Sequence, residues 1–135
     1  MNLENIIYVS GKPDLYKIIS QGSNMVVGES LIDKKRIPLY LNNQTRMLED
    51  IGIYTYNETQ PLSEIFRIIA EKEEYKETIS HSVKNEELTR YFKEIVPEYD
   101  EERVYISDIK KVIKWYNMLH KSGHLKKQVK QENKN

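Results

Sequence analysis

The sequence contains no cysteine among its 135 residues. Disulfide bonds, thiolate nucleophiles and cysteine-based zinc or iron–sulfur sites are therefore excluded, and nothing favours an oxidising compartment. No apolar run approaches the ~18–20 residues that span a bilayer, and the first residues lack the basic region and long apolar stretch of a signal peptide. These absences predict a cytoplasmic protein that is neither secreted nor inserted into a membrane.

A phosphate-binding loop is also missing. The dipeptide Gly11-Lys12 is the nearest approach to one. However, Ile6 stands where the upstream glycine belongs, and Pro13 stands where Ser or Thr must follow the lysine. This segment is therefore interpreted as a turn that leads into the first strand.

Metal and catalytic motifs are equally absent. His120 and His124 have the i, i+4 spacing of two helical ligands, but Gly123 lies between them and no third ligand is evident. The acidic residues of the segment 98–108 lack the alternating oxygen ligands and central glycine of an EF-hand. The sequence consequently predicts a protein that is not an enzyme and that holds no metal and no cofactor.

Strand-like segments occupy the N-terminal half. Each is short, rich in β-branched residues and bounded by turn residues. They cover residues 15–21, 25–31, 37–41 and 51–56. We expect Pro38 at a sheet edge or a bulge, because it cannot donate to a ladder, and a single helical turn at 44–49. The pattern predicts an α+β protein in which a small SH3-like antiparallel β-barrel, or a bent sheet, precedes a helical C-terminal region.

Three helices are predicted in the C-terminal half. The first opens at Pro61, the second has Asn85 as N-cap and stops at Pro97, and the third is capped by Ser107-Asp108, with Gly123 as its C-terminal stop. Each has apolar residues at helical spacing on one face. From these positions we expect burial of Phe66, Phe92, Ile113 and Tyr116.

The domain organisation follows from these elements. Residues 1–72 are predicted to form the small barrel-like domain with a closing helix. In residues 73–84 the apolar residues do not recur at helix or strand spacing, so this segment is interpreted as a linker. Residues 85–122 are expected to form a helix, an extended loop and a second helix, and residues 123–135 a basic tail.

Three segments in order suggest a family. They are Tyr8-Val-Ser-Gly-Lys-Pro-Asp-Leu-Tyr-Lys, Leu48-Glu-Asp-Ile-Gly-Ile-Tyr-Thr-Tyr and Val104-Tyr-Ile-Ser-Asp-Ile-Lys-Lys-Val-Ile-Lys-Trp-Tyr-Asn. Together they resemble an uncharacterised bacterial family, a domain of unknown function. The resemblance implies a compact, barrel-like N-terminal domain followed by a short helical one. It implies no activity.

The charge distribution supplies the candidate site. The net charge is zero, but residues 106–135 carry 8 lysines and only 2 acidic side chains. On the third helix the lysines fall opposite the apolar face, and an aromatic residue borders them. Such a surface can follow phosphates and stack on a base, which favours contact with RNA or DNA. The predicted contact residues are Lys110, Lys111, Lys114, Trp115, Lys121, Lys126, Lys127 and Lys130.

Two other interpretations remain open from the sequence. Lysines on the outer face of an amphipathic helix most often serve solubility. Alternatively, the protein is an adaptor that docks a protein partner through the barrel face or through the segment 98–106, named the acidic connector, where exposed tyrosines suit an interface. The tyrosines considered are Tyr54, Tyr56, Tyr99 and Tyr105. The sequence leaves the oligomeric state open.

Overall fold

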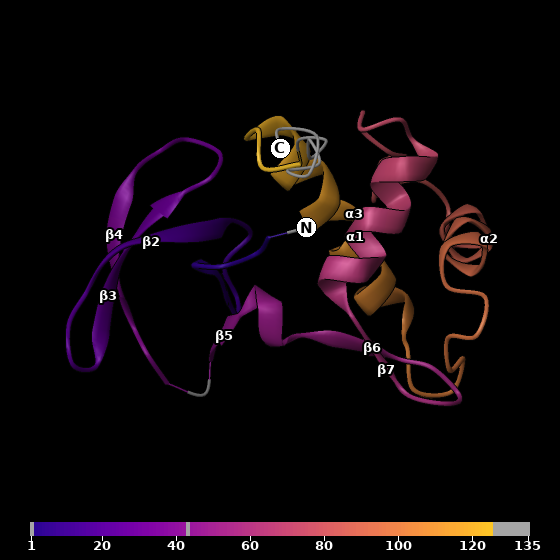
Figure 1. The fold of residues 1–135 in the computed structure, drawn as a ribbon, viewed down its shortest axis with the longest axis horizontal. Helices are drawn as coiled ribbons and strands as arrows, with labels where there is room; N and C mark the ends of the chain where they lie inside the picture. The colour runs from indigo at the N-terminus through magenta and orange to yellow at the C-terminus, as the bar shows by residue number, and fades with distance from the viewer. Residues whose placement is uncertain (1, 43, 126–135) are drawn as a thin grey trace, which may run out of the picture.

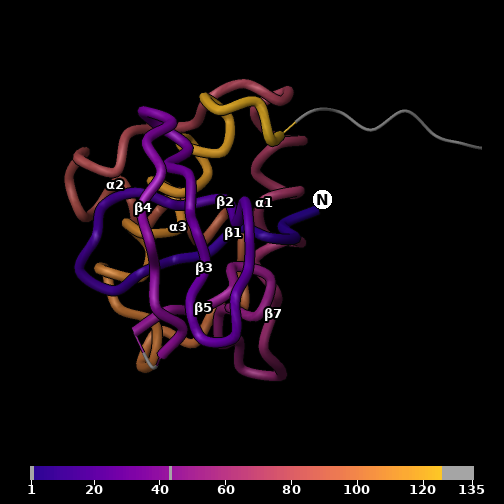
Figure 2. The backbone as a smooth tube through the Cα atoms, turned by 90° about the vertical axis from the view of Figure 1, so that its left-hand side faces the viewer, coloured from indigo at the N-terminus to yellow at the C-terminus, as the bar shows by residue number. Residues whose placement is uncertain are grey.

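The computed structural model describes residues 2–42 and 44–125 and has the predicted α+β architecture. The chain forms a five-stranded sheet and three α-helices in its described residues. The sheet lies toward one end of the molecule and the helices toward the other (Figure 1). Figure 2 views the molecule from the sheet end, with β3 and β4 in front of the helices. No helix within the described ranges is long and apolar enough to cross a membrane.

The main sheet is antiparallel and open. Its spatial order is β4 (Arg36–Tyr40), β3 (Met25–Ser30), β2 (Leu15–Gln21), β1 (Ile6–Val9) and β5 (Thr45–Met47). Pro38 lies on the edge strand β4, which confirms its expected place. A register shift between Ile18 and Ser20, where β2 pairs with β3, marks a bulge that bends the sheet.

Of the two predicted alternatives, a small SH3-like barrel or a bent sheet, the barrel is wrong, and the strand expected to end it shows why. After β5 the 3₁₀ turn η1 (Leu48–Asp50) leads the chain away from the sheet. It overlaps the predicted helical turn at 44–49 only at Leu48 and Glu49, because Thr45–Met47 forms the strand β5. The segment expected as a final strand at 51–56 contains β6 (Gly52–Tyr54), which pairs with β7 (Thr59–Pro61) in a separate hairpin. Since β6 is not available to the sheet, β4 and β5 remain its two edges.

The two faces of the sheet contribute to different apolar clusters, one shared with the helices and one made by the strands themselves. Ile6 of β1 points into the main core with the helices, whereas the next residue, Ile7, belongs to a second apolar cluster on the opposite face. Val26 and Leu39 reach this cluster from β3 and β4. Gly28 is needed there, because a Cβ at its position would lie 2.6 Å from Leu39 Cδ1.

The helices are α1 (Leu62–Lys72), α2 (Asn85–Ile95) and α3 (Ile106–Lys121), close to their predicted positions. The caps differ from the prediction. Lys84 is the N-cap of α2, and Tyr105 is the N-cap of α3. The backbone N–H of Tyr105 donates to Asp108 Oδ2 at 2.9 Å. Gly123 follows α3 with φ +83°, the conformation of a glycine stop.

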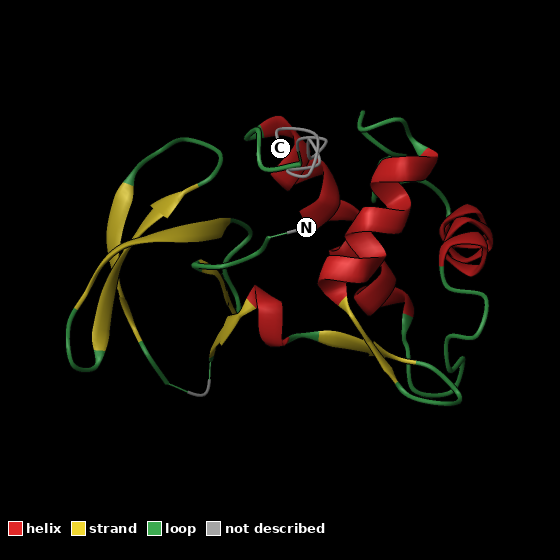
Figure 3. Cartoon of the chain, viewed as in Figure 1, coloured by secondary structure: helices red, strands yellow, loops and turns green. Residues whose placement is uncertain are grey.

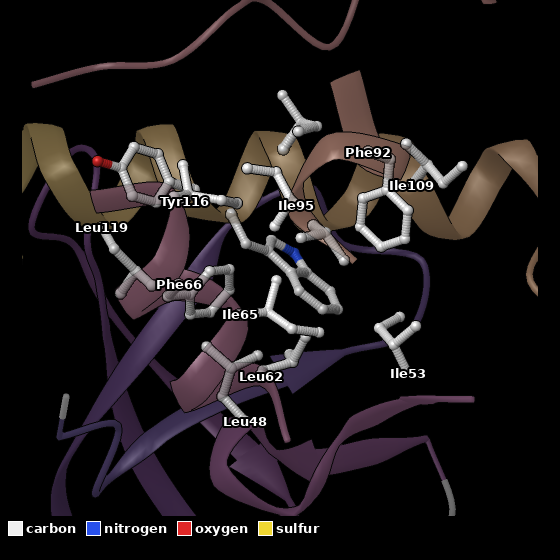
Figure 4. Close-up of a cluster of buried hydrophobic side chains, with 14 of the residues drawn as sticks. Leu48, Ile53, Leu62, Ile65, Phe66, Phe92, Ile95, Ile109, Tyr116 and Leu119 are labelled. Carbon is white, nitrogen blue, oxygen red and sulfur yellow. The ribbon is translucent and has the colours of Figure 1, made fainter. Parts of the chain in front are cut away.

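The main core fills the space between the sheet, the 3₁₀ turn and all three helices (Figure 4). The expected burial is confirmed: the four residues concerned are fully inaccessible to solvent, namely Phe66, Phe92, Ile113 and Tyr116. Phe66 and Tyr116 have ring centroids 6.4 Å apart, which joins α1 to α3. The strand-rich and helical halves therefore share one core.

The segment 73–84, which the sequence predicts to be a linker, has no helix or strand (Figure 3) and is held against α3. Asn117 Oδ1 accepts the N–H of Thr78 at 2.8 Å, and its Nδ2 donates to the carbonyl of Ile79 at 3.0 Å. The Tyr116 hydroxyl donates to the carbonyl of Lys76 at 2.7 Å. Burial, followed by the nearby Glu73 carboxylate, raises the pKa of Tyr116 to about 12, so its hydroxyl stays a donor at neutral pH.

Replacing Asn117 with alanine should lower the free energy of unfolding by about 1–3 kcal/mol, because backbone groups of 78–79 lose their partners. The measurement is urea denaturation, supported by faster hydrogen exchange at the Thr78 amide. The exposed Lys121 lies one turn further along the helix, and Lys121→Ala should change the stability by less than about 0.5 kcal/mol. An equally small effect of Asn117→Ala would show that the segment is not held by this side chain.

Candidate functional site

The exposed face of α3 is basic. Neighbouring elements cover most of the helix, and its buried residues are Ile109, Val112, Ile113, Trp115, Tyr116, Met118 and Leu119. Four of the predicted contact residues remain accessible: Lys111 and Lys121 are exposed, and Lys110 and Lys114 are partly exposed. We name these four lysines the basic ridge. Lys126, Lys127 and Lys130 lie outside the described residues.

None of the ridge lysines forms an ion pair in the described part of the chain, although Asp108 lies in the first turn of the same helix. Within residues 2–42 and 44–125, the ion pairs all involve other side chains, so no carboxylate neutralises Lys110, Lys111, Lys114 or Lys121. Solvent-exposed cations in a row along one helix attract an anionic polymer.

Trp115 does not lie on this exposed face. It is 5% exposed, and its ring centroid is 4.9 Å from that of Tyr8 on β1. The expectation that the Trp115 ring is accessible on the basic face of α3 for stacking on a base is therefore wrong. The physical reason is that β1 packs against α3 beside α1 and α2, which makes the buried face wider than the helical period alone indicates.

A pocket of about 330 Å³ lies beside the ridge, where β1, β5, η1, the β6–β7 hairpin and α3 meet. We name it the junction pocket. Its apolar wall includes Ile53, Leu62, Val104 and Val112. Its aromatic and charged lining comprises Tyr8, Arg46, Asp50, Tyr54, Arg103, Asp108, Lys111 and Trp115. Lys111 thus belongs to both the ridge and the pocket.

Two cations at the pocket lie over aromatic rings. Lys111 Nζ is 5.5 Å from the centroid of the Tyr8 ring, and Arg103 Cζ is 4.3 Å from that of Tyr54. These distances are typical of cation–π contacts, which orient the charges at the rim. Arg103 Nε also donates to Asp100 Oδ2 at 2.8 Å, and this hydrogen bond is the main cause that lowers the pKa of Asp100.

The pocket joins the three segments that carry the family resemblance. Tyr8 comes from the first segment, Asp50 from the second, and Lys111 and Trp115 from the third. Prediction from the sequence missed the pocket as a site, although these segments were the signal that could have found it. Arg46 lies outside all three, and nothing in the sequence marked it.

Three of the four tyrosines considered for an interface are exposed: Tyr54, Tyr56 and Tyr105, with Tyr105 at 65%. Tyr99 is instead buried against Phe92, with ring centroids 5.1 Å apart. The hairpin is fastened to the acidic connector, because the amide of Asp100 donates to the carbonyl of Tyr54 at 2.9 Å. The exposed tyrosines therefore stand on an ordered surface.

The histidines give no metal centre. Across residues 2–42 and 44–125 no group of three or more His, Cys, Asp or Glu side chains is arranged to hold an ion. His124 Nδ1 is instead 2.8 Å from Ser122 Oγ. Burial is the main cause that lowers the pKa of His124, with Lys17 and Lys34 adding to it, so the ring is neutral at physiological pH.

Comparison with known proteins finds relatives but no described activity. Residues 51–119 match a family model described as a domain of unknown function, DUF6852, and residues 3–48 match a second such model, DUF5606. A protein from Bacteroides vulgatus, solved by solution NMR, is similar in structure with a TM-score of 0.69 and 41% identity. The similarity covers 90% of this chain and 88% of that one. No protein with a curated description matches the chain.

Proposed function

The chain belongs to the DUF6852 family, and we propose that it is a non-catalytic cytoplasmic binding module that contacts RNA or DNA along the basic ridge. The tail lysines Lys126, Lys127 and Lys130 extend this contact in the proposal. Neither an enzymatic reaction nor a membrane is part of the function.

The observation that carries the proposal is the charge of the exposed α3 face. Four lysines occupy it, and no described carboxylate pairs with them, whereas five basic residues elsewhere in the described ranges form ion pairs. A polyanion that binds such a row releases condensed counterions, so its affinity falls steeply with salt. A row of lysines that serves only solubility makes no such contact.

Replacing Lys110, Lys114 and Lys121 with glutamate should abolish binding of a fluorescein-labelled single-stranded oligonucleotide, measured by anisotropy at low salt. The affinity of the unsubstituted protein should fall as salt rises. A plot of the logarithm of the association constant against the logarithm of the salt concentration should have a slope of about −0.7 for each phosphate contact. The three substitutions reverse charge on the ridge without entering the core.

The matched control reverses three exposed lysines elsewhere, Lys12, Lys35 and Lys76. It changes the net charge by the same amount and should leave most of the affinity in place. Equal losses in the two triple variants would mean that net charge alone drives binding. Unchanged binding in the ridge variant would refute the proposed contact.

A protein partner is the second candidate, favoured by the exposed tyrosines Tyr54, Tyr56 and Tyr105. Recovery of partners from host lysate, with and without nuclease, separates the two functions. Nuclease-sensitive recovery of RNA or DNA supports the ridge. Nuclease-resistant recovery of one protein, lost in Tyr54→Ala and Tyr56→Ala but retained in the ridge variant, supports the adaptor.

A further inference from the structure

We propose that the junction pocket binds one nucleotide, either free or as part of a nucleic-acid strand lying along the ridge. The inference deepens the proposed function and rests on it for the strand-bound case. It starts from the position of the pocket, whose lining includes Lys111, the residue that the pocket shares with the ridge. A strand that follows the ridge lysines therefore reaches the lining of the pocket at Lys111.

The size and lining suit a planar, partly apolar group. About 330 Å³ is at the lower end of the roughly 300–1,000 Å³ of small-ligand sites. Ile53, Val104 and Val112 supply an apolar wall, and the nearly buried Trp115 also lines the pocket. A nucleobase is a planar group of this kind, and the planar Arg103 guanidinium, with its Cζ 4.3 Å from the centroid of the Tyr54 ring, is a further lining group suited to it.

The charges around the pocket suit a phosphate together with a base. Arg46 and Lys111 have no ion-pair partner within the described ranges, so both are free to bind a phosphate oxygen. Arg103 is already paired with Asp100. Two carboxylates also line the pocket: Asp108 already accepts the N–H of Tyr105, whereas the exposed Asp50 can accept an N–H of a base. An inorganic anion alone would use the cations and leave the apolar wall and Asp50 without a partner.

The chain carries its own probe for this site. Trp115 is its single tryptophan and lines the pocket, so a bound nucleotide should change its fluorescence. Adenosine monophosphate should give a saturable change, and adenosine or inorganic phosphate alone should bind at least tenfold more weakly. The same titrations by calorimetry detect binding even if the fluorescence responds weakly.

Two variants and one control assign the site. Arg46→Gln and Lys111→Gln should each weaken binding of adenosine monophosphate at least fivefold, because each removes one phosphate contact. Lys121→Gln removes a ridge charge that does not line the pocket, and it should leave this affinity unchanged. Circular dichroism checks that all three variants are folded.

The outcomes separate the pocket from the ridge. Absence of both a calorimetric and a fluorescence response to adenosine monophosphate would overturn the pocket proposal, and so would equal weakening by Lys121→Gln. If the oligonucleotide still binds in a ridge-dependent way, the proposed function survives that result. If the mononucleotide binds and the oligonucleotide does not, the ligand is a free nucleotide, and the ridge proposal fails alone.

Discussion

Phe92→Ala should lower the free energy of unfolding by about 3–5 kcal/mol, the usual cost of removing a buried aromatic side chain. Phe92 is fully buried on α2, and its ring packs edge-on against Tyr99 of the acidic connector at 5.1 Å. The substitution removes this contact and leaves a cavity between α2 and the connector. Because a domain of this size has about 5–15 kcal/mol of total stability, a large share of it should be lost.

Urea denaturation of the purified variant measures this loss. Tyr105→Ala is the matched control, since it also removes an aromatic ring but from a site that is 65% exposed. It should change the stability by less than about 0.5 kcal/mol. A loss below about 1 kcal/mol for Phe92→Ala would contradict the packing of α2 described above.

Leu15→Ala should destabilise both halves of the molecule together, by about 2–5 kcal/mol. Leu15 lies on β2 and is fully buried, and its backbone nitrogen is 3.2 Å from Met118 Sδ of α3. The residue therefore belongs to the sheet and contacts the helical half directly. Since the two halves share one core, a cavity on the sheet side should weaken the helices as well.

Two probes follow the same unfolding reaction. Fluorescence reports on Trp115 beside β1, and far-ultraviolet circular dichroism reports on the helices. In Leu15→Ala the unfolding midpoints from the two probes should decrease by the same amount, as expected for a two-state transition. Ile19→Ala, on the same strand at a site 40% exposed, should leave both midpoints nearly unchanged. Separated midpoints, or an unmoved helical signal, would mean that the two halves unfold independently.

The helical half was predictable because its signals are local. Apolar residues recur at helical spacing from Leu62 to Leu119, and the burial of Phe92 and Tyr116 follows from that period alone. The sheet was predicted less well, because strand pairing joins distant residues. β1 was missed: its run Ile6–Val9 is only four residues long and is mostly buried on both faces, so it shows no alternation. The open sheet depends on the pairing of β6 with β7, a hairpin close in the chain that was missed because the short strand Thr59–Pro61 has no alternating apolar pattern.

In the candidate site too, the residues that depend on local sequence were predictable, and those that depend on distant contacts were not. The lysines of the ridge could be found from the sequence, because their spacing and the apolar residues opposite them belong to one helix. The burial of Trp115 could not, since it depends on Tyr8, which lies more than a hundred residues away in the chain. The junction pocket draws its lining from several separate elements, and only their packing brings Arg46 and Lys111 into one pocket.

The open sheet has a consequence for the behaviour of the protein at high concentration. Unpaired edge strands can recruit strands from other molecules and so start aggregation. Here β4 carries Pro38, which has no N–H to offer, and the exposed charge of Arg36, while β5 is only three residues long. Both edges are therefore poor templates for a further strand, and concentrated solutions should resist the growth of fibrils that begin from the folded state.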